Sequence, residues 1–388
     1  MKGNHELLAW GEAPQTRDSL WRSENGMQPP KRFILADDSL NADSAYQLAC
    51  EGVGLLWQGD FQNARQLLNA MARRCDRPAR KSNKDRNDRK DAAPAPAQQF
   101  HLHRQVQSQR ARTLGMLIIP LTSHYTIALK RAPDVVDACT EVYGAISADT
   151  GDSILSLRAL QSLIGAHEWR KKGVFIPALG DAIHPYYGVF SPIRGEYIDL
   201  VATTPLPGAA LAFDIGTGTG VLAAVLAKRG VKQVIATDQD TRALQCANDN
   251  IQRLDLSDRI RLVVADLFPE GKAPLIVCNP PWVPARPSSP IEYAIFDPDS
   301  RMLRGFLEGL AAHLEPEGEG WLLLSDLAEH LGLRTRDELL GWIAQANLVV
   351  VDRIDVKPSH RKIADQADLL HSARASEVTS LWRLAINH

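Results

Sequence analysis

The stretch Leu-Ala-Phe-Asp-Ile-Gly-Thr-Gly-Thr-Gly, residues 211–220, decides the fold of this chain. Its first five residues, Leu211–Ile215, form a short apolar run of the kind that makes a buried parallel strand. The run Val221–Ala227 after the glycines predicts a helix. Glycines between a strand and a helix can adopt positive φ and let a ligand approach the backbone without meeting a Cβ. The stretch therefore predicts a nucleotide-type cradle.

The spacing of the three glycines, Gly216, Gly218 and Gly220, distinguishes between cofactor classes. A nicotinamide or flavin fingerprint, G-x-G-x-x-G, needs its third glycine one position later, where this chain has Val221. The G-x-G-x-G spacing suits a turn on which no pyrophosphate rests against the helix N-terminus. An ordinary tight turn is the alternative, since glycine-rich turns also occur outside binding sites.

Two later strands each end in an acidic residue. The strand Gln233–Asp238 places Asp238 22 positions beyond Gly216, and a carboxylate there can accept hydrogen bonds from two ribose hydroxyls. The segment Arg261–Asp266 repeats the pattern, and Asp266 is placed to accept from an adenine amino group. An acid at a strand end can also cap a helix or lie in solvent, and that alternative stays open for both residues.

A fourth strand leads into Cys-Asn-Pro-Pro-Trp, residues 278–282. Leu275–Cys278 brings Asn279 to the carboxyl edge of the sheet, where open α/β sheets bind ligands. A planar amide or amino nitrogen is a weak nucleophile because its lone pair is delocalised, so it must move towards tetrahedral geometry to attack. The side-chain oxygen of Asn279 and the carbonyl of Pro280 can accept its two N–H bonds and favour that geometry.

The rest of this motif supports the same chemistry. Pro280 and Pro281 fix φ and remove amide donors, which stiffens the loop that carries the acceptors. Trp282 offers a flat face on which a base or an amide can stack. In-line attack by such a nitrogen depends mostly on positioning. The alternative is a proline-rich turn that carries a core tryptophan.

These motifs resemble those of the class I S-adenosylmethionine-dependent N-methyltransferases of the Asn-Pro-Pro-aromatic type. Within that class the chain is similar to the protein-glutamine N5 methyltransferases and to the adenine-N6 and guanine-N2 methyltransferases of rRNA and tRNA. The resemblance covers Tyr187 to about Val356. It implies an α/β fold with a seven-stranded, doubly wound, Rossmann-like methyltransferase domain, an antiparallel last strand and a smaller N-terminal α/β domain.

One segment resembles the glutamine enzymes only in part. Ile193–Val201 is similar to the Pro-Arg-Pro-Glu-Thr-Glu segment that precedes their cofactor strand, but both prolines are absent, at Ile193 and Gly195. Trp282 stands where those enzymes usually have tyrosine. The motifs therefore specify the reaction class better than the substrate.

The resemblance also implies which residues form the site. Catalytic roles fall on Asn279, Pro280, Pro281 and Trp282. Contacts with S-adenosylmethionine as the cofactor fall on Asp214, Gly216, Thr217, Gly218, Gly220, Asp238, Gln239, Asp266, Leu267, Asn279 and Arg194. No metal ligand is expected.

Length and composition agree with a soluble enzyme of two domains. A chain of 388 residues with 45% hydrophobic residues can bury a large core. The sequence contains no run of about eighteen apolar residues and no signal-peptide stretch, so neither a membrane span nor secretion is expected. The five cysteines lack zinc or disulfide spacing, which indicates a reducing cytoplasm. A net charge of -2 does not favour nucleic-acid binding through bulk charge.

The remaining C-terminal elements complete the seven-stranded pattern. Helices are expected at 298–314 and 336–347, and strands at 320–326, 348–356 and 379–387. Segment 283–297, with its prolines and serines, is expected to be a long loop over the active site. It is either a lid or a plain connection.

The N-terminal half predicts a separate α/β substrate-recognition domain, with a weak resemblance to the N-terminal half of duplicated rRNA guanine-N2 methyltransferases. Strands are expected at 32–36, 53–57, 115–120 and 125–130, and helices at 133–142 and 154–164. One helix face that predicts core consists of Phe61, Ala64, Leu67, Leu68 and Met71. The predicted division is 1–145 for this domain, 146–200 for a helical and hairpin connector and 201–388 for the methyltransferase domain.

Arg73–Lys90 is dense in arginine and lysine and predicts a disordered basic insertion at about 76–99. A solvated linker is the first interpretation of this segment. The second is an arm that contacts rRNA phosphates.

Three functions agree with these patterns. The first is an N-methyltransferase that acts on a macromolecule, either rRNA or a glutamine of a translation protein. The second is a small-molecule N-methyltransferase of specialised metabolism. The third is a non-catalytic cofactor-binding module, which would leave Asn279 and the proline pair without a role. The sequence does not separate the first two.

Overall fold

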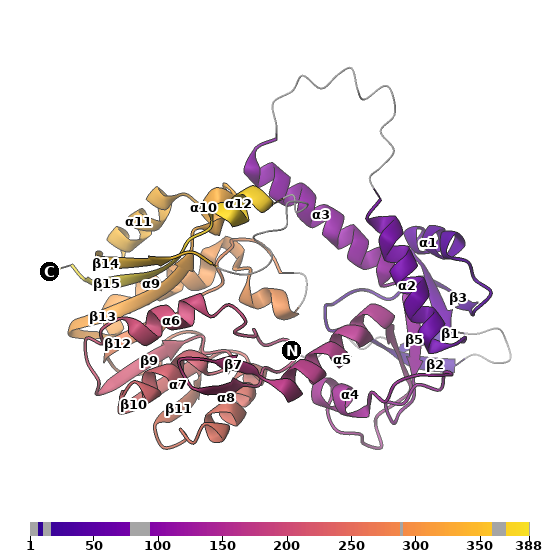
Figure 1. Cartoon of the computed structure of the whole chain (residues 1–388), viewed down its shortest axis with the longest axis horizontal. Coiled ribbons are helices and arrows are strands. Elements are labelled where there is room, and N and C mark those ends of the chain that lie inside the picture. Colours follow the sequence, from indigo (N-terminus) through magenta and orange to yellow (C-terminus); the bar gives the residue numbers. More distant parts are fainter. Residues whose placement is uncertain (1–6, 11–16, 78–93, 288–289, 359–369, 388) are drawn as a thin grey trace. The chain divides into compact units, whose positions relative to one another are not determined.

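The computed structural model describes residues 7–10, 17–77, 94–287, 290–358 and 370–387. Contacts within the chain divide it into two compact units. The N-terminal unit comprises Met1–Pro94 and His101–Glu168, and the C-terminal unit comprises Ala95–Phe100 and Trp169–His388. Each unit is an α/β structure with a sheet of its own (Figure 1).

The C-terminal unit is built, within the described residues, on a seven-stranded sheet in the order β11-β10-β9-β12-β13-β15-β14. The strands from β11 to β13 pair in parallel, whereas β15 pairs antiparallel with both β13 and β14. Across the sheet the bounds are β11 Ile260–Val264, β10 Gln233–Asp238, β9 Leu211–Ile215, β12 Ala273–Cys278, β13 Leu314–Ser325, β15 Thr379–Ile386 and β14 Leu348–Val356. The predicted fold class, with its antiparallel last strand, is confirmed.

Helices cover both faces of this sheet. On one face the helices are α6 (Glu196–Thr203), α7 (Val221–Lys228) and α8 (Thr241–Arg253). On the other face they are α9 (Arg301–His313) and α11 (Arg336–Gln345). Because helices on both faces exclude water from the central strands, those strands are mostly apolar, with Asp214 in β9 as a buried exception.

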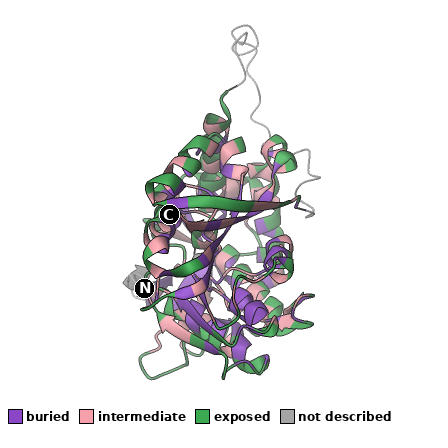
Figure 2. Ribbon diagram, turned by 90° about the vertical axis from the view of Figure 1, so that its left-hand side faces the viewer, coloured by how far each residue is buried: buried purple, intermediate pink, exposed green. Residues whose placement is uncertain are grey.

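Strand β12 illustrates how the two cores are separated. Leu275 and Val277 belong to the core under α7, whereas Ile276 and Cys278 belong to the core under α9. This alternation follows from the period of two in a strand. Figure 2 shows the buried residues gathered along the strands and the inner faces of the helices.

Helix α9 begins later than the prediction of residue 298. Asp299 and Ser300 have positive φ values of 56° and 53°, which cannot continue into a helix. They form a short 3-10 turn, η3 (Pro298–Ser300). The buried carboxylate of Asp297 then accepts the N–H groups of Met302 at 2.9 Å and Leu303 at 3.1 Å, so it anchors the start of α9.

The other expected C-terminal elements are present with small shifts. The helix expected at 336–347 is α11, and the strands expected at 348–356 and 379–387 are β14 and β15. Strand β13 extends six residues further towards the N-terminus than the predicted 320–326. Two shorter helices are α10 (Leu327–His330) and α12 (His371–Ser376).

The described residues of segment 283–297, which omit 288–289, form a loop that contains a 3-10 turn, η2 (Pro290–Ala294). The N–H of Val283 donates to the carbonyl of Ile295 at 3.1 Å, and its carbonyl accepts from the N–H of Asp297 at 2.9 Å. Val283 itself is buried against Leu331. The two ends of the loop are therefore tied together, whereas its role as a lid stays a prediction.

The segment predicted as a connector contains the boundary between the units, which lies after Glu168. In the C-terminal unit it forms an antiparallel pair, β7 (Val174–Ile176) and β8 (Asp181–Ile183). Ile176 and Ile183 are buried in the same core as α6 and α7. The hairpin is therefore packed against the seven-stranded sheet structure of its own unit.

The N-terminal unit is built on a six-stranded sheet among the described residues, in the order β1-β2-β6-β5-β4-β3. Strands β3, β4 and β5 pair in parallel, β2 pairs in parallel with β6, and the pairs β5–β6 and β1–β2 are antiparallel. The bounds are β1 Leu7–Trp10, β2 Arg17–Arg22, β3 Arg32–Ala36, β4 Val53–Trp57, β5 Leu117–Leu121 and β6 Ser153–Ser156. The strands expected at 32–36 and 53–57 are confirmed.

The strand expected at 125–130 is wrong. Tyr125 has a φ of 54°, and its N–H donates to the carbonyl of Thr122 at 2.9 Å. The N–H of Thr122 in turn donates to the carbonyl of Thr126 at 2.9 Å, which closes a tight turn. The ring of Tyr125 is buried, so the apolar residues of this segment indicate burial rather than a strand.

The helices of this part of the chain are α1 (Ala42–Cys50), α2 (Phe61–Cys75), α3 (Pro96–Leu114), α4 (Val136–Tyr143) and α5 (Leu157–Lys172). The buried residues of α2 are the five that the sequence predicted for its core face. Most of the basic insertion expected at about 76–99 lies outside the described residues, which omit 78–93. Its predicted end is wrong, because α3 already begins at Pro96. Just before the insertion, Arg74 forms an ion pair with Asp43 at 2.6 Å.

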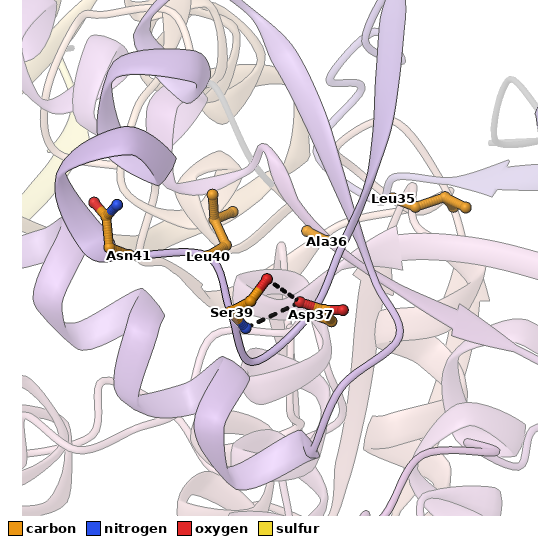
Figure 3. A pocket seen from close by; sticks show the side chains of 6 residues that line it. All are labelled: Leu35, Ala36, Asp37, Ser39, Leu40 and Asn41. Carbon is orange, nitrogen blue, oxygen red and sulfur yellow. Dashed lines mark hydrogen bonds between the residues drawn. The ribbon is translucent and has the colours of Figure 1, made fainter.

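A pocket at the carboxyl end of β3 carries none of the predicted site residues (Figure 3). It is lined by Leu35, Ala36, Asp37, Ser39, Leu40 and Asn41. The hydroxyl and N–H of Ser39 donate to Asp37 and lower the pKa of that carboxyl. The side chain of Asn41 caps α1 by accepting the N–H groups of Asp43 and Ser44. These polar groups therefore hold the turn between β3 and α1.

Within the described ranges, no helix has the length and apolar character that a membrane span requires. In the same residues, no cluster of three or more His, Cys, Asp or Glu side chains is arranged to hold a metal ion. All five cysteines are free thiols.

Candidate active site

The predicted motifs meet at the carboxyl edge of the seven-stranded sheet. β9 and β12 are parallel neighbours (Figure 1). The glycine turn after β9 and Asn279 after β12 therefore lie at the same edge. The order of the strands reverses here, because β10 lies on one side of β9 and β12 on the other. Such a switch point is where open α/β sheets bind ligands.

The three glycines of the turn all have positive φ: 71° for Gly216, 56° for Gly218 and 80° for Gly220. A Cβ on Gly216 would collide with the side chain of Met302, and one on Gly220 would lie 3.2 Å from the Cβ of Ala247. These two glycines therefore permit close packing. A Cβ on Gly218 would meet no atom within 4 Å, so this position adjoins open space that a ligand can enter.

Asp214 shapes the turn from inside the fold. Its side chain is buried, and its Oδ2 accepts the hydroxyl of Thr217 at 2.6 Å and the N–H of Ala223 at 3.1 Å. Burial raises the pKa of this carboxyl to about 6, against the opposing effect of the two hydrogen bonds. Asp214 and Thr217 were predicted as cofactor contacts, and here they hold the backbone that carries the glycines.

Asp214 gives the stability of the unit a pH dependence. Because its pKa is higher in the folded state than the ordinary 3.8, its contribution to stability is complete below about pH 4 and is lost as the pH rises through about 6. We expect this carboxyl to lower the free energy of unfolding by on the order of 3 kcal/mol as the pH rises, and we expect Asp214→Asn to abolish that decrease. Urea unfolding between pH 4 and 8 measures it, with exposed Asp258→Asn as the control. Parallel stability curves for wild type and Asp214→Asn would contradict the prediction.

Asp238 ends β10 beside the glycine turn. Its Oδ2 accepts the N–H of Gly218 at 3.1 Å, and its Oδ1 accepts the N–H of Asp240 at 2.9 Å. Burial raises the pKa of Asp238, although these two N–H donors favour the charged form. A carboxylate offers about four acceptor positions, so Asp238 retains acceptor capacity for the hydroxyls of a ligand.

The other predicted cofactor contacts lie around the same edge. Asp266 forms an ion pair with Arg301 at 2.6 Å, and both side chains are exposed. The carbonyl of Leu267 accepts the hydroxyl of Thr237 at 2.5 Å, and Gln239 is exposed just after β10. The predicted contact between Asp266 and an adenine amino group therefore competes with Arg301.

The motif Asn279–Trp282 contains a direct contact that the sequence did not predict. The indole N–H of Trp282 donates to Oδ1 of Asn279 at 2.9 Å. Both side chains are half-buried, and Pro280 between them is buried. The preceding Cys278 is buried, and burial raises the pKa of its thiol, so it is not a reactive nucleophile.

Arg194 lies over the indole ring of Trp282, with its guanidinium carbon 5.0 Å from the ring centroid. Its Nε donates to Glu196 at 2.8 Å, and a terminal nitrogen donates to Glu377 at 3.0 Å. The guanidinium is therefore engaged with protein groups. Its predicted contact with the cofactor stays a prediction.

Two residues that hold Arg194 in place, Glu377 and Ser325, were not predicted from the sequence. Glu377 is 2% exposed, and one of its oxygens accepts the hydroxyl of Ser325 at 2.6 Å. No local motif marks Glu377, because its partners are 52 and 183 residues away. Ser325 could have been predicted as a site residue, because it ends β13, the strand next to β12, and so lies at the same sheet edge.

Comparisons with known proteins point to one enzyme class. The family model described as ribosomal protein L11 methyltransferase (PrmA) matches residues 200–280. The tRNA1(Val) (adenine(37)-N6)-methyltransferase of Shewanella loihica is 29% identical over 212 residues, which are 50% of this chain and 84% of that protein. The release factor glutamine methyltransferase of Rhodopirellula baltica is 36% identical over 120 residues, which are 29% of this chain and 38% of that protein.

The family match includes the glycine turn and extends through Asp238 and Asp266 to Asn279. The C-terminal unit is a class I S-adenosylmethionine-dependent N-methyltransferase domain. S-adenosylmethionine is the cofactor of this methyltransferase domain, as the sequence predicted. A crystal structure of the ribosomal protein L11 methylase from Lactobacillus delbrueckii subsp. bulgaricus matches 55% of this chain and 91% of its own, with 19% identity and a TM-score of 0.38.

The geometry of the methyltransferase domain fits this cofactor. The open space beside Gly218 gives a ligand access to the backbone of the turn. Asp238, bonded to the N–H of that same glycine, keeps acceptor capacity for ribose hydroxyls. The residues that hold the adenosyl part would therefore be the glycine turn and Asp238, with Asp266 further along the edge.

Proposed function

We propose that this methyltransferase domain methylates a planar nitrogen, either an amide or an exocyclic amino group, of a macromolecule such as an RNA or a protein of the translation machinery. The observation that carries the proposal is the position of Asn279. Its Oδ1 is oriented by Trp282 at the end of β12, one strand from the glycine turn. An acceptor oxygen held at that edge suits a nitrogen that must give up its planarity.

The residues of the chain act on the acceptor nitrogen. S-adenosylmethionine supplies an electrophilic methyl group when bound. Oδ1 of Asn279 accepts an N–H of the acceptor and thereby concentrates the nitrogen lone pair for attack, and Pro280 and Pro281 keep that oxygen in place. No protein base is required, because the methylated nitrogen becomes acidic and loses a proton to water. Catalysis then rests mainly on positioning.

The names of the relatives support a macromolecular acceptor. One relative is named for an adenine of a tRNA and another for a glutamine of a release factor, and both acceptor groups are planar nitrogens. The N-terminal unit has its own sheet and carries none of the methyltransferase motifs, so we assign substrate recognition to it. The basic segment 73–90 and a cytoplasmic location stay predictions from the sequence.

A transfer assay tests this function. Purified full-length protein is incubated with methyl-labelled S-adenosylmethionine and, in separate reactions, with total tRNA, ribosomes, release factors or a metabolite extract from cells that lack the gene. We expect label in one macromolecular fraction, sensitive to either nuclease or protease. Asn279→Ala serves as the inactive control.

The small-molecule alternative gives a different result in the same assay. Label confined to the metabolite fraction would overturn the macromolecular acceptor. Label in a carboxylate ester or a carbon position of any acceptor, identified by mass spectrometry, would overturn the assignment to nitrogen.

A further inference from the structure

The indole of Trp282 is bonded to the same oxygen that the proposed reaction uses. Its N–H donates to Oδ1 of Asn279 at 2.9 Å, across the two prolines that separate them. An amide oxygen has two lone pairs, so this bond leaves one for an incoming N–H. It also settles which end of the Asn279 amide is presented, because the amide NH2 cannot accept the indole proton.

The indole is itself held in place by Arg194. The guanidinium carbon lies 5.0 Å from the centre of the ring, within the range of a cation–π contact. Arg194 donates to Glu196 at 2.8 Å and to Glu377 at 3.0 Å. Charge-assisted bonds of this kind to a largely buried guanidinium restrict its rotamers, and so restrict the ring beneath it.

Glu377 connects this group to the sheet. Its side chain is 1% exposed, and the oxygen that accepts from Arg194 also accepts the hydroxyl of Ser325 at 2.6 Å. Ser325 is the last residue of β13, the strand next to β12. A series of side-chain contacts therefore connects the core of the domain to the acceptor oxygen. Its members, in order, are Ser325, Glu377, Arg194, Trp282 and Asn279.

We propose that Trp282 is a positioning residue: its indole N–H, held by Arg194 and Glu377, orients the Asn279 amide so that Oδ1 meets the methyl-accepting nitrogen. This inference rests on the proposed function of Asn279. It differs from a stacking role, because Arg194 covers one face of the indole and leaves at most the other for a base or amide. The tryptophan supplies an N–H donor at this position, whereas a phenyl ring has no donor and a phenol carries its O–H at the far end of the ring.

Trp282→Phe tests the donor separately from the ring. Phenylalanine keeps an aromatic face under Arg194 but has no N–H. With tRNA and ribosomes as the acceptor probes, we expect kcat to fall roughly tenfold, the effect of one lost hydrogen bond in the transition state, with little change in KM. Trp342→Phe is a matched control, because Trp342 also lies beneath an arginine, Arg304 at 5.5 Å, and it should leave kcat unchanged.

A double-mutant cycle shows whether Trp282 acts through Asn279. In an Asn279→Ala background, Trp282→Phe should cause no further loss of kcat, since the group to be oriented is gone. Additive losses of kcat would overturn the inference. So would a Trp282→Phe enzyme with raised KM and unchanged kcat, because that pattern belongs to stacking.

A spectroscopic measurement tests the contact without any acceptor. The protein has eight tryptophans, and the indole N–H signal of Trp282 in a 15N-labelled sample is the one lost in Trp282→Phe. In Asn279→Ala this signal should shift and its exchange with water should accelerate. An unchanged signal would overturn the inference even if methyl transfer is demonstrated. Conversely, if no acceptor fraction is methylated, the proposed function fails while this spectrum still decides whether the contact exists.

Discussion

Asn279→Ala should lower turnover by roughly 100-fold or more while it leaves the affinity for S-adenosylmethionine nearly intact. The size is that seen when one preorganised polar group is removed from the place where charge develops. Asn279 meets the acceptor nitrogen rather than the glycine turn, so its effect belongs to the transition state and not to cofactor binding. Single-turnover transfer rates and calorimetric titration with the cofactor separate the two quantities.

Asn279→Asp is the matched comparison for this variant. Aspartate keeps an oxygen that accepts from both the Trp282 indole and the acceptor nitrogen, so we expect it to retain much more turnover than alanine. Full activity in Asn279→Ala would mean that this motif does not hold the acceptor. The assignment of the reaction to a planar nitrogen would then have to be abandoned.

Asp238→Ala should weaken the binding of S-adenosylmethionine by about 1.5 to 3 kcal/mol, roughly 10- to 150-fold in Kd, as expected for hydrogen bonds lost from a charged group. The carboxylate serves two purposes, since it also accepts the N–H of Gly218 at 3.1 Å. Part of the loss will therefore come from the turn. Calorimetry of the full-length protein with the cofactor measures the change.

Asp266→Ala and Asp258→Ala are the controls for Asp238. Asp266 is exposed and already paired with Arg301, so its replacement should cost less affinity than that of Asp238. Asp258 is an exposed carboxyl outside the carboxyl edge of the sheet and should have no effect. Tight binding of NADH with no binding of S-adenosylmethionine would contradict the cofactor assignment as a whole.

The sequence predicted the C-terminal fold because its signals are local. An apolar run, three glycines at fixed spacing and a helical run define one strand–turn–helix unit. At Asp238 and Asn279, too, an apolar strand leads directly into a polar residue. The positive φ values of Gly216, Gly218 and Gly220 follow from that local pattern. Local signals failed at 125–130, where a buried tyrosine with positive φ has the composition of a strand but the geometry of a turn.

Which side chains meet was decided by the tertiary structure. The sequence placed Arg194 with the cofactor and Trp282 with the substrate, but it contained no sign that they would contact each other or that Glu377 would join them. Ion pairs and hydrogen bonds form between whichever groups the sheet brings to one edge. The ends of β12 and β13 and the entry to β15 meet only after the strands pair in the order 12-13-15.

What the sequence by itself determined is therefore the class of the domain, its sheet and the residues that line its carboxyl edge. The tertiary structure decided how those residues share their hydrogen bonds: Asp214 and Thr217 within the turn, Asp266 with Arg301, and Asn279 with Trp282. The physical reason is the distance along the sequence over which each property is encoded. Backbone conformation and burial pattern are encoded within a few neighbouring residues, whereas a hydrogen-bond partner 183 positions away is chosen by strand order and packing.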